Sequence, residues 1–357
     1  MSDNELPRIM GLFQKRIDGD DALLHLAKIR FKESGLCAEF YADTLDELDW
    51  LLKFKPVPES SAVAHLHRGI NLLEEESQRL ITDFASAFAG QIYGLVIHDQ
   101  IEMAASLDDY LSAVYRIESE LKEINQVPYL FIEYAVGLEP DRFLEFFKRI
   151  HHLERVSACL DIGHIGLWQV RDAFRQGHPG VDICAFAPHD PRLKQVIGDI
   201  GNAVNSALPI VISVVHALGR LGKPLHFHLH DGHPLSSLSP FGISDHISFL
   251  SEIPIPFEYN GEHVLLPMFG PSGLSEIVDE TLKTLSPDLV SFTLEIHPEE
   301  GRIPLSDASH LFYHWTDKTN AERMNYWLSV LKQNYRLLLD ACKSSGKNNF
   351  TIYGAQV

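Results

Sequence analysis

The sequence predicts a single (β/α)8 barrel, and three observations support this fold class. Short apolar runs rich in β-branched and aromatic residues alternate with longer segments of helical period, which is the pattern of repeated parallel βα units. Eight such runs can be counted, the number that a closed barrel needs. The chain of 357 residues is long enough for one large barrel with insertions, and no low-complexity linker divides it.

The strands and helices follow from these patterns in order along the chain. Apolar residues at three-to-four-residue intervals predict helices over residues 107–124, 141–150 and 275–285, and a long C-terminal helix over residues 324–338. We expect the barrel to span residues 1–343 and a polar tail to cover residues 344–357. The predicted strands are residues 36–41, 62–67, 92–98, 129–134, 156–162, 224–230, 263–267 and 290–296.

Two stretches interrupt the alternation. Residues 176–222 are too long for one crossover, so we expect an insertion with two helices between the fifth and sixth predicted strands, forming a lid or a subunit contact. Within it, residues 178–221 are the candidate interface of a homo-oligomer. Residues 232–262 follow a strand end and are rich in Gly, Pro and Ser, which predicts a working loop.

Composition narrows the functional class. The net charge is −19, so the surface would repel a polyphosphate backbone, and nucleic acid is not an expected partner. Apolar runs fall short of the roughly 20 residues of a membrane helix, and the N-terminus lacks the layout of a secretory signal. The 4 cysteines are too few and scattered for a disulfide framework. We therefore expect a cytoplasmic protein that acts on a small molecule, with no membrane partner.

Carboxylates and imidazoles gather at the ends of the predicted strands. The carboxyl ends of parallel barrel strands build one face, so these side chains should converge there. Several carboxylates packed together without a cation would repel one another, and a divalent metal resolves that conflict. Oxygen ligands with one imidazole suit Mn²⁺, Mg²⁺ or Co²⁺, and more histidines favour Zn²⁺. The strand-end residues are His65, His67, His98, Asp99, Glu133, Asp161, His164, His226, His228, His230, Asp231, His233, Glu295 and His297.

Four of these segments resemble a known superfamily. FIEY at Glu133, CLDIGH at Asp161 to His164, HFHLHDGH at His226 to His233 and TLEIH at Glu295 look like the strand-four, -five, -six and -eight motifs of the xylose isomerase-like TIM barrels. That superfamily includes sugar phosphate isomerases and epimerases, inosose dehydratases, and endonuclease IV of AP endonuclease family 2. The resemblance covers residues 36–297.

The resemblance implies a metal site and a substrate site. Its metal ligands would be Glu133, Asp161, His228 and Glu295, and His164 would contact substrate. His230 stands where many relatives have a lysine or a small residue. We expect His98, His230 and Arg302 to contact substrate as well.

The chemistry of the set favours an isomerase or epimerase of a sugar or a small polyol-like carbonyl compound. A divalent cation that chelates a carbonyl and a neighbouring hydroxyl lowers the pKa of the adjacent C–H. Glu133 and Glu295, on opposite sides of the barrel, would then be the catalytic residues, transferring a proton across a metal-chelated enediolate.

Two other functions remain open. A metal-dependent hydrolase or dehydratase with a multinuclear zinc centre would add ligands at His67 (or His65), His98, Asp231 and His233, or less well at Asp245 and His246. A non-catalytic barrel that binds a metabolite is the third. Residues 270–273, GPSG, fit either a phosphate site at a helix N-terminus or a simple turn with a cap.

Overall fold

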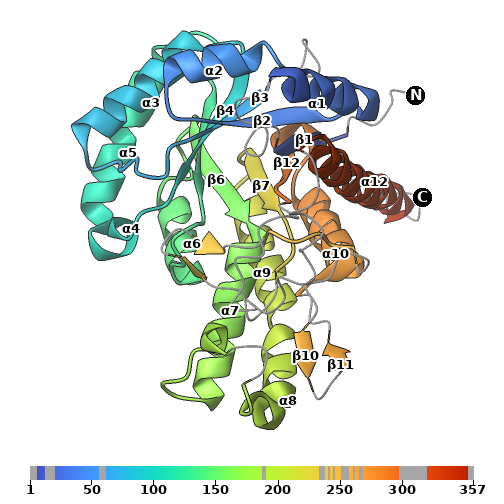
Figure 1. The fold of residues 1–357 in the computed structure, drawn as a ribbon. Coiled ribbons are helices and arrows are strands. Elements are labelled where there is room, and N and C mark those ends of the chain that lie inside the picture. Colours follow the sequence, from blue (N-terminus) through green and yellow to red (C-terminus); the bar gives the residue numbers. More distant parts are fainter. Residues whose placement is uncertain are drawn as a thin grey trace.

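The computed structural model describes residues 6–12, 21–55, 62–186, 190–232, 238–239, 242–243, 246–250, 257–259, 262–264, 268–296 and 320–352. Within them the chain forms a closed barrel of parallel strands surrounded by helices (Figure 1), which confirms the predicted (β/α)8 fold class. The order around the barrel is β1, β12, β7, β6, β5, β4, β3, β2. These strands are β1 Arg8–Leu12, β2 Cys37–Ala42, β3 Ala62–Leu66, β4 Ile92–His98, β5 Tyr129–Glu133, β6 Val156–Asp161, β7 Leu225–Leu229 and β12 Val290–Leu294.

One predicted barrel strand is wrong, and the first strand of the barrel lies outside the predicted runs. The run at residues 263–267 begins inside β11 (Glu262–Val264), which pairs antiparallel with β10 (Phe257–Tyr259) in a separate small sheet. The barrel closes instead through β1, whose five residues RIMGL pair with both β12 and β2. Short apolar runs have the same period in a hairpin and in a barrel, so the period alone cannot separate them.

This correction shifts the numbering of the strands that carry the site. Counted along the chain, β5, β6, β7 and β12 are the fifth to eighth barrel strands. The insertion expected between the fifth and sixth predicted strands therefore lies between β6 and β7, which are the sixth and seventh strands of the barrel.

Part of the barrel floor is apolar. Alternate residues of each strand face the interior, and Gly94 of β4 leaves the space that the ring of Phe131 fills, since a Cβ there would lie 2.5 Å from that ring. Buried Glu39 and His226 lie in register with two floor residues, Val63 and Cys159. The apolar part of the floor consists of Met10, Val63, Val96, Phe131 and Cys159.

Above this floor the interior becomes polar. The next inward position on β3, β4, β5 and β6 lies two residues further along each strand. Because all strands run in the same direction, these positions form one layer at the carboxyl end of the barrel. The residues there are His65, His98, Glu133 and Asp161.

Helices cover the outside of the barrel, and the larger apolar core lies between them and the strands. Side-chain caps fix some helix starts: the Thr44 hydroxyl accepts from Glu47 N, and the Asp161 carboxylate accepts from His164 N. The helices are α1 Asp21–Ser34, α2 Leu45–Leu52, α3 Glu75–Ala87, α4 Glu102–Ala105, α5 Leu107–Lys122, α6 Pro140–Arg149, α7 Ile162–Gly177, α8 Leu193–Val204, α9 Ala207–Gly219, α10 Gly270–Thr284 and α12 Asn320–Ile352, with 3-10 turns at Ile183–Ala185 and Pro287–Leu289 and a hairpin of β8 Leu238–Ser239 and β9 Gly242–Ile243.

The predicted insertion forms α8 and α9. Helix α9 packs against α6, α7 and α10, so it belongs to the outer helical layer rather than to a lid. Helix α8 packs against α7, and it lies with the β10–β11 hairpin at one end of the molecule (Figure 1). By length and composition Leu193–Gly219 is apolar enough to cross a membrane, and 39% of its apolar window is buried inside the structure. The homo-oligomer interface expected here stays a prediction.

The C-terminal helix is longer than expected. α12 continues to Ile352, so residues 344–352 extend the helix instead of forming a separate polar tail. Ser344 and Ser345 donate hydrogen bonds to the carbonyls of Asp340 and Ala341, which lets small polar residues continue a helix. Residues 353–357 lie outside the described part of the chain.

Candidate metal centre

The four expected metal ligands converge at the carboxyl end of the barrel. Glu133 ends β5, Asp161 ends β6, His228 lies in β7, and Glu295 directly follows β12. Each offers one ligand atom, and these atoms all lie within 4.8 Å of one another, with all four residues buried. Three carboxylates and one imidazole from four neighbouring strands thus form one compact cluster.

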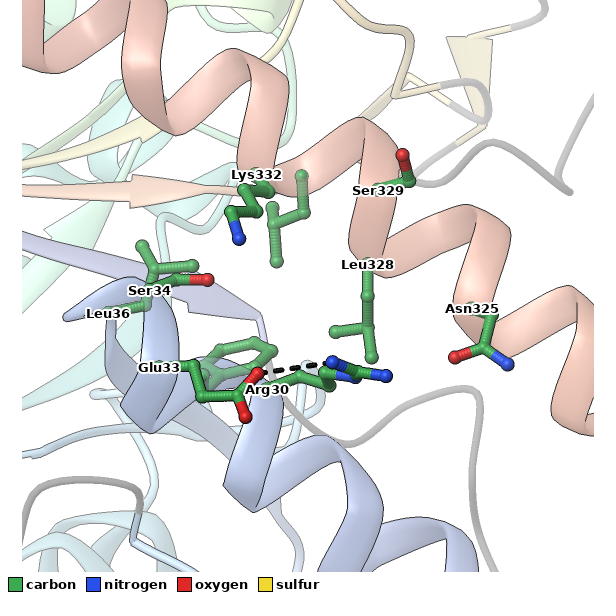
Figure 2. A pocket seen from close by; sticks show the side chains of 10 residues that line it. Arg30, Glu33, Ser34, Leu36, Asn325, Leu328, Ser329 and Lys332 are labelled. Atoms are coloured by element: carbon green, nitrogen blue, oxygen red, sulfur yellow. Dashed lines mark hydrogen bonds and ion pairs between the residues drawn. The ribbon is translucent and has the colours of Figure 1, made fainter.

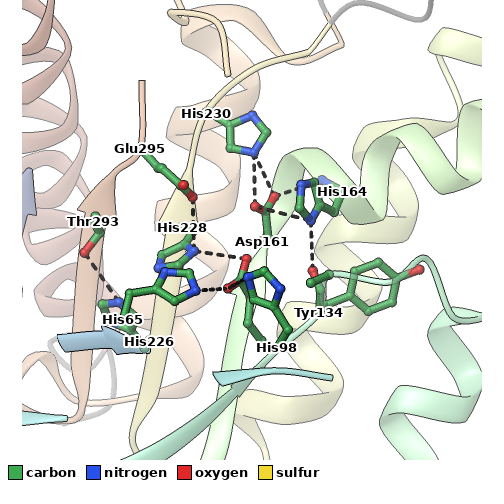
Figure 3. A network of polar contacts seen from close by, with 12 residues as sticks. His65, His98, Tyr134, Asp161, His164, His226, His228, His230, Thr293 and Glu295 are labelled. Atoms are coloured by element: carbon green, nitrogen blue, oxygen red, sulfur yellow. Dashed lines mark hydrogen bonds and ion pairs between the residues drawn. The ribbon is translucent and has the colours of Figure 1, made fainter. Parts of the chain in front are cut away.

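His228 stands at the middle of this cluster. Its Nδ1 lies 3.2 Å from Glu133 Oε1 and 3.2 Å from Glu295 Oε2 (Figure 3). Among the described residues, His228 Nδ1 and Glu133 Oε2 are buried and have no hydrogen-bond partner. Buried polar atoms normally have partners, so unbonded ligand atoms beside buried carboxylates fit a bound cation.

The charged groups around His228 also favour a bound cation. Burial alone would lower the pKa of His228, but Cys159, Glu39, Glu133 and Glu295 raise it well above its ordinary value. Burial likewise would raise the pKa of Glu133, but the neighbouring His228, His98 and His65 lower it. The carboxylates therefore favour positive charge at this point, which a divalent cation would supply.

Asp161 is held in place by His230. His230 Nε2 lies 2.9 Å from Asp161 Oδ1, and its Nδ1 donates to the carbonyl of Asp231 at 2.9 Å. Burial would lower the pKa of His230, but Asp161 raises it to about 9, so the ring is an imidazolium at neutral pH. Gly163 makes room for this ring, because a Cβ there would lie 2.1 Å from it.

His230 therefore differs from the expected substrate contact. Both of its nitrogens are used within the protein, and its side chain is fully buried. It orients a ligand carboxylate instead, as outer partners of metal sites do.

His164 is better placed to meet a substrate. Its Nδ1 donates to the carbonyl of Tyr134 at 3.1 Å, which leaves the lone pair on Nε2. That Nε2 is buried without a hydrogen bond among the described residues. Burial lowers the pKa of His164, so its ring is neutral and can accept a proton from a hydroxyl or bind a cation.

A second group of ligand atoms shares Glu133. His65, His98 and Glu133 offer ligand atoms within 4.8 Å of one another. His65 Nε2 lies 3.2 Å and His98 Nε2 3.4 Å from Glu133 Oε2, the oxygen that faces away from His228. Burial lowers the pKa of His98 to about 4, so this imidazole is neutral and able to ligate. One carboxylate therefore faces two candidate sites.

His67 lies apart from both groups. It follows the end of β3, its side chain is exposed, and its Nδ1 accepts from Gly69 N at 3.0 Å. Of the two histidines considered for this strand, the structure brings His65 and not His67 to the site.

Asp231 serves the loop before α10 rather than the cluster. Its carboxylate accepts from the backbone amides of Gly232, Met268, Phe269 and Gly270, the last at 2.7 Å. These include the free amides at the start of α10, so a side-chain carboxylate already fills the place where the GPSG segment was expected to hold either a phosphate or a cap. His233 and Arg302 lie outside the described residues.

Two buried or half-buried side chains of the site, Glu39 and Tyr41, fall outside the expected set. Glu39 of β2 is fully buried and contacts His228 and His226. Tyr41 donates to Glu295 Oε1 at 2.6 Å, and His246, considered above as a ligand of the hydrolase alternative, has its Nδ1 3.4 Å from the same oxygen. A charged residue two positions before a tyrosine inside an apolar run was the available signal for Glu39 and Tyr41.

A separate pocket lies on the outside of the barrel between α1 and α12 (Figure 2). Its lining includes Arg30, Glu33, Asn325 and Lys332, and Arg30 pairs with Glu33 at 3.1 Å. None of the candidate ligands lines it. The candidate ligands at the strand ends therefore lie outside this pocket.

The chain matches no protein-family model, and no curated protein matches its sequence. The case for function therefore depends on the residues of the barrel mouth themselves.

Proposed function

We propose that this protein is a metal-dependent isomerase or epimerase of a sugar or a small polyol-like carbonyl compound, acting in the cytoplasm. The observation that carries the proposal is the buried cluster of Glu133, Asp161, His228 and Glu295. It has the oxygen-rich donor set that Mn²⁺, Mg²⁺, Co²⁺ and Zn²⁺ accept. The resemblance of these strand ends to xylose isomerase-like barrels supports the same assignment.

A cation bound there would hold the carbonyl and an adjacent hydroxyl of the substrate and polarise the carbonyl. The residues of the chain would do the rest. Glu133 and Glu295 lie on strands three positions apart around the barrel wall, with β6 and β7 between them. They flank a bound substrate, so that one removes a proton from carbon and the other returns it.

The two glutamates have different surroundings. Glu295 Oε1 accepts a hydrogen bond from the Tyr41 hydroxyl, whereas Glu133 Oε2 faces the imidazoles of His65 and His98. A carboxylate that already accepts a hydrogen bond is the weaker base. We therefore assign Glu133 as the residue that removes the proton and Glu295 as the one that returns it, while His164 Nε2 accepts from a substrate hydroxyl.

The test is solvent exchange with the two Glu→Gln variants. Wild type loaded with Mn²⁺ or Co²⁺ and incubated with a panel of free and phosphorylated ketoses in D₂O should place deuterium beside the carbonyl. At Mn²⁺ or Co²⁺ concentrations high enough to keep the metal bound, Glu133→Gln and Glu295→Gln should lower turnover by about 10²- to 10⁴-fold, the usual worth of positioned proton transfer. Isomerisation without deuterium would show an internal hydride shift and leave the glutamates as ligands only.

A second candidate function rests on the position of His65 and His98 beside Glu133. His65, His98 and Glu133 could hold a second cation, and two cations would supply activated water for hydrolysis or dehydration. Metal analysis separates the two functions. One equivalent per chain supports the isomerase; two or more equivalents, reduced by His65→Gln and unchanged by His67→Gln, support the hydrolase or dehydratase. Absence of any bound metal would favour the metabolite-binding barrel.

A further inference from the structure

We infer that Glu39 is a positioning residue for the metal centre. Its carboxylate contacts one ring nitrogen of His228 and one of His65, so that the other nitrogen of each ring faces Glu133. The inference rests on the proposed metal site and adds to it a residue that does not itself touch the cation. It concerns how the chain holds its ligands, independently of which substrate is used.

Glu39 is a carboxylate buried inside the barrel, where its charge must be stabilised by partners. It is in the middle of β2, in register with Val63 of β3, and its side chain is fully buried. A buried charge costs several kcal/mol unless it is paired and hydrogen-bonded. Its partners should therefore reveal its role.

Glu39 contacts side chains of the barrel interior. Glu39 Oε1 lies 2.9 Å from His228 Nε2 and 3.4 Å from His65 Nδ1. Glu39 Oε2 lies 3.0 Å from His226 Nε2 and also accepts from the Thr293 hydroxyl. Three imidazoles and one hydroxyl thus point at one carboxylate.

These contacts set the protonation of the ligand. An ionised carboxylate only accepts hydrogen bonds, so His228 must carry a proton on Nε2 where it meets Glu39. The lone pair for a cation is then available on Nδ1, the atom that lies 3.2 Å from both Glu133 and Glu295.

His65 repeats the arrangement. Its ring lies between the same two glutamates, with Nδ1 toward Glu39 and Nε2 toward Glu133 at 3.2 Å. The ring also stacks on Tyr41, with centroids 4.2 Å apart, which fixes its plane. One buried carboxylate therefore aims two imidazoles at one shared ligand.

Another buried glutamate shows what a purely structural role looks like. Glu118 of α5 accepts from the backbone amides of Glu154, Arg155 and Val156, and so anchors the start of β6. Its replacement should weaken folding without reaching the metal centre. Glu118→Gln is therefore the matched control for Glu39→Gln.

The experiment is a titration of metal-free protein with Co²⁺ and Zn²⁺, without substrate. Glu39→Gln should weaken binding by about 10- to 100-fold, the usual effect of removing an outer partner of a metal-bound histidine, and should change the visible Co²⁺ spectrum. Glu118→Gln should lower the melting temperature and keep both the wild-type affinity and the wild-type spectrum. Should Glu39→Gln not fold, Glu39→Asp keeps the charge but withdraws it from His228, and its affinity should also fall.

Three results would overturn the inference. The first is wild-type affinity and spectrum in Glu39→Gln. The second is a lower number of bound ions at unchanged affinity, since Glu39 would then be a ligand in its own right. The third is a wild type that binds neither ion, which would refute the proposed function as well. A wild type that binds metal but neither isomerises nor exchanges deuterium with any sugar of the panel refutes the proposed function alone and leaves this inference standing.

Discussion

Three barrel strands each place an aspartate at or just after their carboxyl end, and the partners of these aspartates are of two kinds. Asp161 at the end of β6 meets the imidazole of His230 and points toward the ligand cluster. Asp231, just after β7, meets four backbone amides of the loop that leads into α10. Asp99, just after β4, accepts from the amides of Ala135 and Val136.

The difference appears in their pKa values. Burial would raise the pKa of Asp161, but His164 and His230 lower it below its ordinary value. Burial raises the pKa of Asp231 to about 6 and that of Asp99 to about 7, because their amide partners offset only part of the cost. A strand-end carboxylate facing imidazoles is thus held ionised and able to bind a cation, whereas one facing amides serves to hold a loop.

The largest expected effect separates Asp161 from Asp231 by metal affinity. Asp161→Asn removes a charged ligand, so affinity for Co²⁺ or Zn²⁺ should fall by more than the roughly 100-fold that marks the upper effect of an outer partner. Asp231→Asn has nearly the same shape, and the Asp231 carboxylate contacts backbone amides rather than a candidate ligand, so the affinity of this variant for both ions should stay close to that of wild type. Calorimetric titration of the metal-free proteins measures both.

This comparison also tests the hydrolase alternative, in which Asp231 is an additional ligand. A loss of bound metal in Asp231→Asn comparable to that in Asp161→Asn would contradict the loop-holding role. It would also require the carboxylate to leave its amide partners when the cation binds.

The next largest effect is on the free energy of unfolding, which should depend more on Asp231 than on Asp161. Asp231→Ala leaves the amides of Gly232, Met268, Phe269 and Gly270 without their acceptor. A buried donor left without its acceptor costs about 1–3 kcal/mol, so the free energy of unfolding in urea should fall by at least about that amount. Asp231→Asn keeps one acceptor oxygen and should lose less, and equal losses in the two variants would show that the side chain's volume, not its bonds, stabilises the loop.

The sequence could predict the ligand cluster because each ligand ends an apolar run. A polar residue there stands out, and the parallel direction of the strands brings such ends together. The strand-end pattern marks Glu133, Asp161, His228 and Glu295 among a larger set, and the resemblance to xylose isomerase-like barrels selects these four. Their ligand atoms lie within 4.8 Å of one another.

Glu39 could not be recognised by the same reasoning. It lies inside its strand, where a charged residue usually faces solvent, and only the register of β2 shows that it faces the barrel interior. The roles of Asp161 and Asp231 were equally inseparable in the sequence, since both follow apolar runs. The partners that distinguish them, His230 and the amides of residues 268–270, depend on contacts between distant segments.

The smallest expected effect concerns Asp99 and depends on pH. A raised pKa in the folded state means that Asp99 stays protonated up to about pH 7, while the unfolded chain loses this proton near its ordinary value. The folded state then binds more protons between roughly pH 4 and 7, so the contribution of Asp99 to stability falls as the pH rises through that window. At pH 8 the full cost of the buried charge is present.

Asp99→Asn should remove this cost, because an amide keeps the oxygen that accepts from Ala135 and Val136 and carries no charge. The shift of about three pKa units sets an upper limit of about 4 kcal/mol, and weaker hydrogen bonds to a neutral acceptor offset part of it, leaving a gain of about 1–2 kcal/mol at pH 8. Urea unfolding should show this gain at pH 8 and its disappearance near pH 4. Asp83→Asn, on an exposed side chain of α3, should show no such change. A gain that persists at pH 4 would mean that the charge of Asp99 is not its source, whereas a loss of stability at pH 8 would place Asp99 with Asp161 rather than with Asp231.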